Sequence, residues 1–195
     1  MSVIYAVSDL HGCYDKYIKL LERLKMNPND FLYILGDIVD RGSDGMKILL
    51  DLINRKNVFS YRGNHDHYAQ IMLRNFALAN DGCFADGLEK TFRLWLSDGG
   101  SVTYEGFLKL NESNQQAVLN YLNSLPLFEK LTVGGRKFFL AHTVPEKAKM
   151  LNTDNCRIPD FIMGEPEYEK KYFEDTTIVT GHTPTWFIAP EYTGR

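Results

Sequence analysis

The chain has 195 residues, of which 44% are hydrophobic and 24% are charged, and its formal net charge is −3 at pH 7. This length suits one domain, and this composition is that of an ordinary soluble globular protein. The small negative charge excludes a polycationic nucleic-acid binder, and no apolar run approaches the length of a membrane span. We therefore expect a single cytoplasmic domain over residues 1–195 that binds neither nucleic acid nor a membrane.

The cysteine content argues against an extracellular disulfide framework. The chain has three cysteines, Cys13, Cys83 and Cys156. An odd number at wide spacing, with no C-x-x-C pair, is typical neither of a disulfide scaffold nor of a structural zinc site. The N-terminal apolar run over residues 3–7 follows no basic stretch and is too short for a signal peptide.

The first third of the chain alternates strand-like and helix-like segments. Residues 3–8, 31–35 and 58–61 are apolar and rich in β-branched or aromatic residues, which predicts buried strands. Apolar residues at helical spacing predict helices over residues 14–24 and 46–53. This βαβαβ order predicts parallel neighbouring strands joined by right-handed crossovers.

The middle of the chain, residues 67–125, predicts a helical insertion. An apolar stripe at helical spacing runs over residues 88–96, and Asp98-Gly99-Gly100 should interrupt it. Ser113 with Gln116 resembles a capping box before a further helix. We interpret the segment as a cap-like insertion over the site, and its aromatic side chains as core rather than as a ligand platform.

The last third of the chain returns to strands. Residues 128–133 and 137–141 flank Gly134-Gly135, a pattern that predicts a β-hairpin. Residues 176–180 predict another strand, and residues 186–188 predict one more.

Short polar motifs follow the predicted strands and contain four of the five histidines of the chain. Functional side chains of an open α/β sheet gather at the carboxyl ends of its strands, so we expect these motifs to meet. In chain order they are Asp9-Leu10-His11-Gly12, Gly36-Asp37-Ile38-Val39-Asp40-Arg41-Gly42, Gly63-Asn64-His65-Asp66, Ala141-His142 and Gly181-His182-Thr183-Pro184.

The side chains in these motifs are of the types that bind transition metals. Asp9 and His11 can face one cation, and Asp37 is a carboxylate able to bridge two. Mixed nitrogen and oxygen ligation suits manganese, iron, zinc or cobalt rather than calcium. Two such ions roughly 3.5–4 Å apart can hold both oxygens of a phosphoryl displacement, with a hydroxide between them as nucleophile. The candidate ligands are Asp9, His11, Asp37, Asn64, His142 and His182.

Each motif alone has an ordinary structural explanation. An Asp-x-His pair is usually a surface loop, Gly-Asp is usually a turn, and Ala-His is often a core histidine bonded to the backbone. Their combination in this order, after apolar strands, favours a metal site over coincidence.

The motifs resemble those of the phosphoprotein phosphatase group of calcineurin-like metallophosphoesterases, over residues 3–184. Trp95-x-x-Asp98-Gly99-Gly100 also resembles a Trp–Gly–Gly element of the short bacterial and bacteriophage members. Those members include serine/threonine phosphatases, some of which also act on phosphotyrosine, and their relatives include diadenosine tetraphosphate hydrolases. The resemblance implies an α/β fold, a two-sheet αββα sandwich with a helical insertion and with the site at the sheet edges.

The resemblance also implies roles for individual residues around two divalent ions, with manganese the first choice and iron, zinc, cobalt or nickel the others. His65 would protonate the leaving alkoxide, and Asp40 would orient His65. Arg41 and Arg62 would bind phosphate oxygens, work for which the bidentate guanidinium is suited. The implied ligands are Asp9 and His11 for one ion, Asn64, His142 and His182 for the other, and Asp37 for both.

The chain departs from the family pattern at three positions. Ser8 replaces a common glycine, and we expect little effect. Asp66 stands where many protein phosphatases carry glutamate, and aspartate also occurs there among nucleotide hydrolases. A further phosphate-binding arginine is expected between the two late histidines. Arg157 is the only arginine there, and its flanks fit an ordinary surface residue equally well.

We expect the protein to hydrolyse phosphomonoesters, with a phosphoserine or phosphothreonine protein, and also phosphotyrosine, as the substrate. A phosphorylated small molecule is the other substrate class. Two alternatives stay open: a symmetrical dinucleoside polyphosphate hydrolase with the same metal pair, and a metal-binding interaction module without catalysis. In residues 75–111 acidic side chains outnumber basic ones, which offers a polyphosphate no strong grip and favours the phosphomonoester.

Overall fold

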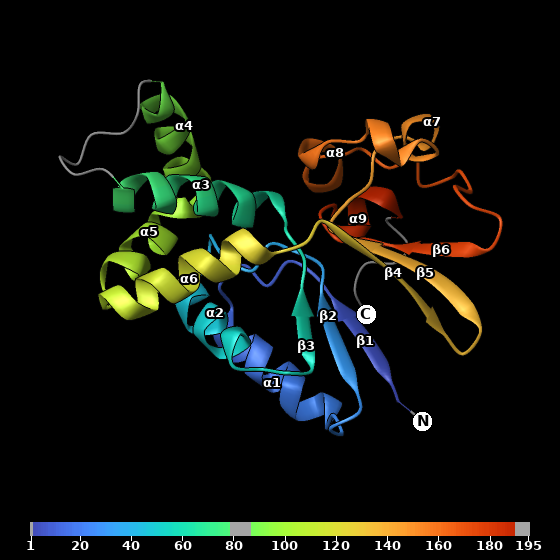
Figure 1. Ribbon diagram of the computed structural model, residues 1–195, viewed down its shortest axis with the longest axis horizontal. Helices are drawn as coiled ribbons and strands as arrows, with labels where there is room; N and C mark the ends of the chain where they lie inside the picture. Colours follow the sequence, from blue (N-terminus) through green and yellow to red (C-terminus); the bar gives the residue numbers. More distant parts are fainter. Residues whose placement is uncertain (1, 79–86, 190–195) are drawn as a thin grey trace.

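The computed structural model describes residues 2–78 and 87–189 (Figure 1). Helices and strands alternate in the first third of the chain. The middle of the chain is helical, and the last third contains both strands and short helices. In chain order the elements are β1 (Ile4–Val7), α1 (Tyr14–Leu24), β2 (Phe31–Ile34), α2 (Gly45–Ile53), β3 (Val58–Ser60), α3 (Asn64–Leu78), α4 (Leu88–Trp95), η1 (Leu96–Gly100), α5 (Ser101–Leu108), α6 (Glu112–Ser124), β4 (Phe128–Val133), β5 (Arg136–Ala141), α7 (Lys147–Met150), η2 (Thr153–Asn155), α8 (Ile158–Ile162), β6 (Thr176–Val179) and α9 (Thr185–Ile188).

The strands form two three-stranded sheets. In the first, β1, β2 and β3 are parallel in that order, so their carboxyl ends lie at one edge, as the βαβαβ pattern predicts. In the second, β4 and β5 form an antiparallel hairpin, and β6 pairs with β5 in parallel. The hairpin turns at Gly134 and Gly135, whose positive φ angles of 54° and 79° suit a tight two-residue connection.

Alternate residues of the strands fill different layers of the core. Leu32 and Ile34 of β2 pack into the cluster that contains apolar residues of α1 and α2, and these helices cover the outer face of the first sheet (Figure 1). Leu35 and Tyr61 pack instead against Leu140 of β5, which joins the two sheets. This is the two-sheet α/β sandwich expected from the sequence.

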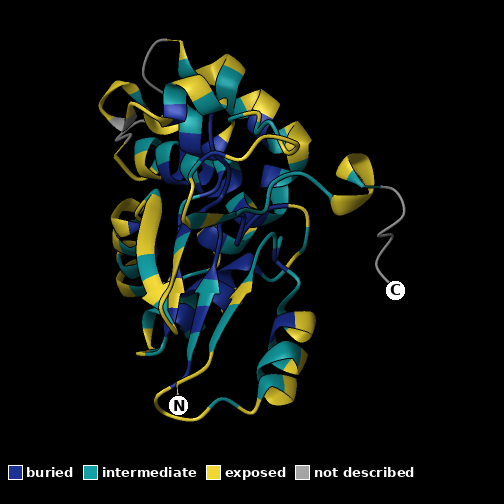
Figure 2. Cartoon of the chain, turned by 90° about the vertical axis from the view of Figure 1, so that its right-hand side faces the viewer, coloured by how far each residue is buried: buried dark blue, intermediate teal, exposed yellow. Residues whose placement is uncertain are grey.

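The outer face of the second sheet has its own core under the short helices α7 and α8. Phe139 of β5 is fully buried there with Met150 and Phe161. Figure 2 shows buried residues gathered at the centre of the molecule, whereas α9, beside the C-terminal end, is exposed.

The middle of the chain is helical, as predicted, and α6 packs on both α2 and α3. The predicted interruption lies inside η1, where Asp98 and Gly99 leave helical geometry before α5 begins. The predicted capping box at Ser113 is wrong. The cap is Asn111, whose side chain accepts a 2.9 Å bond from the Asn114 backbone N–H and starts α6 earlier. That the insertion acts as a cap over the site stays a prediction.

The strand predicted over residues 186–188 is also wrong, because this segment forms α9. Trp186 and Phe187 are 57% and 74% exposed, so neither sheet takes up their apolar surface. A three-residue apolar run fits a helix or a strand equally well. Among the described residues, no strand pairs with this segment.

Two of the three cysteines, Cys13 and Cys156, are free thiols, and Cys83 lies outside the described residues. Among the helices of residues 2–78 and 87–189, none is both long enough and apolar enough to cross a membrane.

Candidate metal centre

The loops after β1, β2 and β6 hold functional side chains in unusual backbone conformations. Six predicted site residues have left-handed φ angles between 42° and 69°. Such conformations cost of order 1–3 kcal/mol each and persist where surrounding contacts hold them, often at functional sites. Paired loops supply such contacts, since His11 N–H donates to the Asp37 carbonyl at 2.9 Å. The six residues are Asp9, His11, Asp37, Asp40, Arg41 and His182.

Three predicted ligands meet at the start of α3 and the ends of β5 and β6. The Asn64 Oδ1 atom lies 3.0 Å from His142 Nε2 and 3.1 Å from His182 Nδ1. The two imidazole nitrogens are themselves 3.1 Å apart. Asp37 Oδ2 lies 3.5 Å from His142 Nε2. Four potential ligand atoms therefore face one point.

The other predicted ligands lie near the same carboxylate oxygen. His11 Nε2 is 3.7 Å from Asp37 Oδ2 and 4.0 Å from Asp9 Oδ1. The second oxygen of Asp9 accepts the His182 backbone N–H at 3.1 Å, which ties the loop after β1 to the loop after β6. Asp37 is thus the residue that the two groups of ligand atoms share.

These separations fit a pair of cations. Two nitrogen or oxygen ligands of one transition metal, each about 2.1 Å from it, lie about 3–4 Å apart. Asp37, His142 and His182 form one compact group of ligand atoms, and His11, Asp37 and His65 form another. The donor set, mixed imidazole, carboxylate and amide oxygen, is that of a transition metal rather than of calcium.

Backbone carbonyls hold two of the histidines in the ligand tautomer. His11 Nδ1 lies 3.1 Å from the Val39 carbonyl, and His142 Nδ1 lies 2.7 Å from the Leu35 carbonyl. A carbonyl oxygen only accepts, so each Nδ1 carries the proton and each Nε2 presents a lone pair to the centre. Burial lowers the pKa of both imidazoles, which keeps them in the neutral form that binds metal.

The shared carboxylate, Asp37, is buried where its ionised form needs a nearby positive charge to be stable. Asp37 is 2% exposed. Burial raises the pKa of its carboxyl group to about 7; the charge of His65 opposes this rise and that of Asp9 adds to it. A bound cation stabilises the ionised form of such a group. The residues present therefore fit the metal pair that the sequence predicts.

A histidine–aspartate pair lies beside the ligands. His65 Nδ1 is 2.8 Å from Oδ2 of the fully buried Asp40. Arg41 approaches His65 Nε2 at 3.1 Å, and since a guanidinium only donates, His65 carries its proton on Nδ1 and donates it to Asp40. Burial lowers the pKa of His65, but the bond to Asp40 and the charge of Asp37 outweigh it and raise the pKa above its ordinary value.

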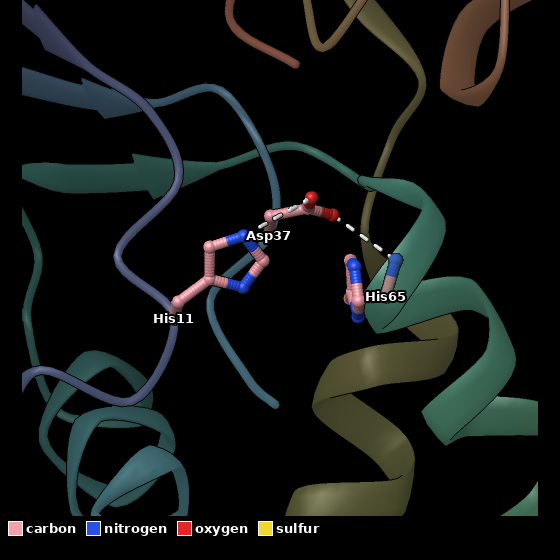
Figure 3. A group of neighbouring side chains, drawn as sticks. All are labelled: His11, Asp37 and His65. Carbon is pink, nitrogen blue, oxygen red and sulfur yellow. Dashed lines mark hydrogen bonds and ion pairs between the residues drawn. The ribbon is translucent and has the colours of Figure 1, made fainter. Parts of the chain in front are cut away.

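Figure 3 shows the Asp37 carboxylate between His11 and His65. Its Oδ1 atom accepts the backbone N–H of His65 at 3.0 Å. The guanidinium of Arg41 spans the same two rings, with Nη1 2.9 Å from His11 Nε2. Arg41 is therefore within reach of both the ligand cluster and the His65 ring.

The other two predicted arginines bond to other parts of the chain. Arg62 Nη2 donates to the carbonyls of Leu122 (3.2 Å) and Asn123 (2.9 Å) at the end of α6, while its Nε is buried with no partner among the described residues. Arg157 is exposed at the start of α8, and its backbone N–H donates to Asp160. The phosphate-binding roles of Arg62 and Arg157 stay predictions.

Two buried residues support the site in ways that the sequence did not indicate. The carboxylate of Asp66 accepts backbone N–H bonds from Gly63 (3.0 Å), Asp37 (2.8 Å) and Ile38 (2.9 Å), and a longer one from Val39 (3.4 Å). It thereby joins the loop after β2 to the loop after β3. Burial raises its pKa to about 7, the charge of Asp37 adds to the rise, and the N–H donors of Gly63 and Ile38 oppose it.

The second is Trp95, interpreted from the sequence as core. Its indole N–H donates to Asp40 Oδ2 at 2.8 Å. The only sequence signal was its place in the Trp95-x-x-Asp98-Gly99-Gly100 element, whose glycines imply close approach to another backbone.

Replacing Asp66 by Asn is expected to lower the free energy of unfolding by roughly 3 kcal/mol, because one buried amide group cannot accept all of these backbone bonds. Urea denaturation measures the change. The exposed Asp175, which pairs with Lys137 at the surface, is the matched control, and Asp175→Asn should cost at most about 1 kcal/mol. Equal losses in the two variants would show that Asp66 does not hold the loops together.

Comparison with known proteins places these features in a family. The model of the calcineurin-like phosphoesterase family matches residues 2–194. A serine/threonine-protein phosphatase 2 from Escherichia coli (strain K12) is 32% identical over 143 residues, which are 71% of this chain and 57% of that protein. A symmetrical bis(5'-nucleosyl)-tetraphosphatase from Buchnera aphidicola subsp. Acyrthosiphon pisum (strain 5A) is 34% identical over 119 residues, 57% of this chain and 41% of that protein.

Among solved structures, a serine/threonine phosphatase from Saccharomyces cerevisiae aligns with a TM-score of 0.47 at 16% identity, over 83% of this chain and 47% of that one. The chain spans about a quarter to somewhat over half of the length of the curated relatives it matches.

Proposed function

The chain belongs to the calcineurin-like phosphoesterase family. We propose that it hydrolyses phosphomonoesters with two divalent metal ions. The observation that supports this most is the convergence of five other candidate ligand residues around Asp37, next to the Asp40–His65 pair. The proposed ligands are Asp9, His11, Asp37, Asn64, His142 and His182.

When bound there, the ions supply charge neutralisation and lower the pKa of a water that becomes the nucleophile. Arg41 holds the phosphoryl group. In the structure its guanidinium donates to His11 Nε2 and His65 Nε2, so it already stands between the ligand cluster and the proton donor. Phosphoryl oxygens are stronger acceptors for a guanidinium fork than two imidazoles are, so substrate would draw these N–H groups away from the rings. His11 Nε2 has one lone pair, so its proposed role as ligand would already release Arg41 Nη1 before substrate binds.

His65 then serves as the general acid. Once Arg41 turns to the phosphoryl group, the Nε2 atom of His65 takes up a proton from solvent, and the imidazolium passes this proton to the departing alkoxide. Asp40 accepts the Nδ1–H and stabilises the imidazolium that precedes proton transfer. The raised pKa of His65 is consistent with this role.

A phosphoserine or phosphothreonine peptide is the substrate that the charges around His65 favour. The carboxylate of Asp98 is 69% exposed and lies 3.9 Å from His65 Nε2, on the side from which the leaving group would depart. A negative charge there tolerates a neutral or basic leaving group and repels a polyphosphate. The second candidate, hydrolysis of dinucleoside polyphosphates, is supported by the relatives named as symmetrical tetraphosphatases.

The experiment is a comparison of kcat/KM on a phosphoserine peptide, a phosphotyrosine peptide and diadenosine tetraphosphate, using the manganese-loaded chain. We expect release of inorganic phosphate from the peptides to be the most efficient reaction. Faster release of ADP from the dinucleotide would favour the second candidate. Metal binding with no hydrolysis of any of the three would favour an interaction module.

Replacing Asp98 by Asn is expected to raise the dinucleotide-to-phosphopeptide ratio of kcat/KM about fivefold, since one exposed charge at this range contributes about 1 kcal/mol. The control Glu89→Gln removes an exposed charge of the same sign from the same insertion and should leave the ratio unchanged. An unchanged ratio in Asp98→Asn would show that this carboxylate does not select the leaving group.

A further inference from the structure

The helical insertion contacts the loop after β2 at three points. Trp95, the last residue of α4, donates its indole N–H to Asp40 Oδ2 at 2.8 Å. Thr103 of α5 accepts the Asp40 backbone N–H at 2.9 Å, and the Gly99 carbonyl in η1 accepts the Arg41 backbone N–H at 3.0 Å. Of these elements, α5 packs on both α2 and α3, and α4 packs on α3 (Figure 1).

The Asp40 carboxylate depends on two donors. It is fully buried, and its Oδ2 atom accepts both the Trp95 indole N–H and the His65 Nδ1–H. Its Oδ1 atom has no hydrogen-bond partner among the described residues. Without the indole donor, only the bond to His65 would fix the rotation of this carboxylate, so the direction of its lone pairs depends on Trp95.

The indole is itself held rigidly. Trp95 is 4% exposed, and a Cβ atom on Gly100 would come within 2.3 Å of its ring. The kink at Asp98 and Gly99 brings this glycine backbone against the ring face. Trp95 therefore has no space to swing away from Asp40.

The same contacts hold strained backbone. Asp40 and Arg41 have φ angles of 69° and 66°, a region that ordinary residues adopt only when neighbouring contacts fix them. The bonds to Thr103 and Gly99 are such contacts. The insertion thus binds both the side chain and the backbone of the residues next to the proton donor.

We propose that Trp95 is a positioning residue whose indole N–H aims the Asp40 carboxylate at His65, so that the insertion controls proton donation to the leaving group. This inference rests on the proposed role of His65 as general acid. Trp95 touches neither substrate nor metal in this arrangement. It acts through Asp40.

The test is Trp95→Phe, which removes the N–H and keeps an aromatic ring, in the full chain loaded with manganese. We expect kcat on a phosphoserine peptide, a poor leaving group, to fall about 30-fold, a part of the 10²–10⁴ that general acids contribute. On p-nitrophenyl phosphate, whose leaving group needs little protonation, the fall should be under threefold. KM and metal content should not change. A lower kcat of equal size on both substrates would overturn the proposal.

Two further variants make this result specific. Trp186→Phe makes the same substitution at the exposed tryptophan of α9 and should leave both rates unchanged. Thr103→Val removes the acceptor of the Asp40 backbone N–H with little change of shape, and should reproduce the same leaving-group dependence more weakly. If Trp95→Phe does not fold, Thr103→Val carries the test, and an equal fall in kcat on the phosphoserine peptide and on p-nitrophenyl phosphate would overturn the proposal.

His65→Asn separates this inference from the proposed function. Strong leaving-group dependence in His65→Asn but none in Trp95→Phe would overturn the positioning role alone. No dependence in either would overturn the general-acid role and the positioning role with it. The bond to Asp40 can also be tested without catalysis, by the NMR resonance of the Trp95 indole N–H, which is identified by its loss in Trp95→Phe. It should move in Asp40→Asn, and an unmoved resonance would contradict the bond to Asp40.

Discussion

Replacement of Asp37 by Asn is expected to remove bound metal and hydrolysis together. Its Oδ2 atom lies 3.5 Å from His142 Nε2 and 3.7 Å from His11 Nε2. An amide in this place lacks the negative charge that two cations would share. We expect metal content, measured by elemental analysis after dialysis, to fall from about two ions per chain to one or fewer, as a two-metal centre requires. We expect kcat to fall at least about 10³-fold.

Asp44→Asn is the matched control for this change. Asp44 belongs to the same loop after β2 but pairs with Lys47 at the surface. This variant should keep its metal content and its activity. Full metal content in Asp37→Asn with activity lost would show that Asp37 serves the reaction in another way than as a ligand.

Replacement of His65 by Asn should have the opposite pattern, with metal content kept and turnover lost. The amide can still donate to Asp40, whereas it cannot deliver a proton to the leaving group. We expect kcat on a phosphoserine peptide to fall about 10²–10⁴-fold, and much less on p-nitrophenyl phosphate. Parallel measurements of metal content and of kcat on the two substrates check this.

The proximity of His65 to the first group of ligand atoms gives this experiment a second use. His11, Asp37 and His65 present ligand atoms to one another, so a metal role for His65 is the competing assignment. Loss of one ion in His65→Asn would support that role and contradict the general-acid role. His67→Asn, two positions further along α3 and half-buried, is the control and should keep both metal and turnover.

The positions of the strand ends could be predicted because they depend on local sequence patterns. Apolar runs before Asp9, Asp37 and Asn64 specify buried strands, and the intervening helical patterns force those strands to be parallel. Parallel strands bring their carboxyl ends to one edge, so the polar motifs had to converge there. The structure confirms the two sheets and brings Asp37 Oδ2 within 3.5 Å of His142 Nε2.

Other features depend on contacts between segments far apart in the chain, which periodicity does not encode. Trp95 is an apolar residue on a helical stripe, and only the fold brings its N–H to Asp40, 55 positions earlier. The backbone donors of Asp66 lie up to 29 positions away. The bonds from Arg62 Nη2 to carbonyls at the end of α6 depend in the same way on the packing of that helix on α3, and the phosphate role of Arg62 stays a prediction.

The most direct measurement is anomalous diffraction from crystals of the manganese-loaded protein. Two peaks roughly 3.5–4 Å apart are predicted. Both should lie within bonding distance of the Asp37 carboxylate, one next to Asp9 and His11 and the other next to Asn64, His142 and His182. A single peak, or a pair that the Asp37 carboxylate does not touch, would contradict a two-metal site bridged by Asp37.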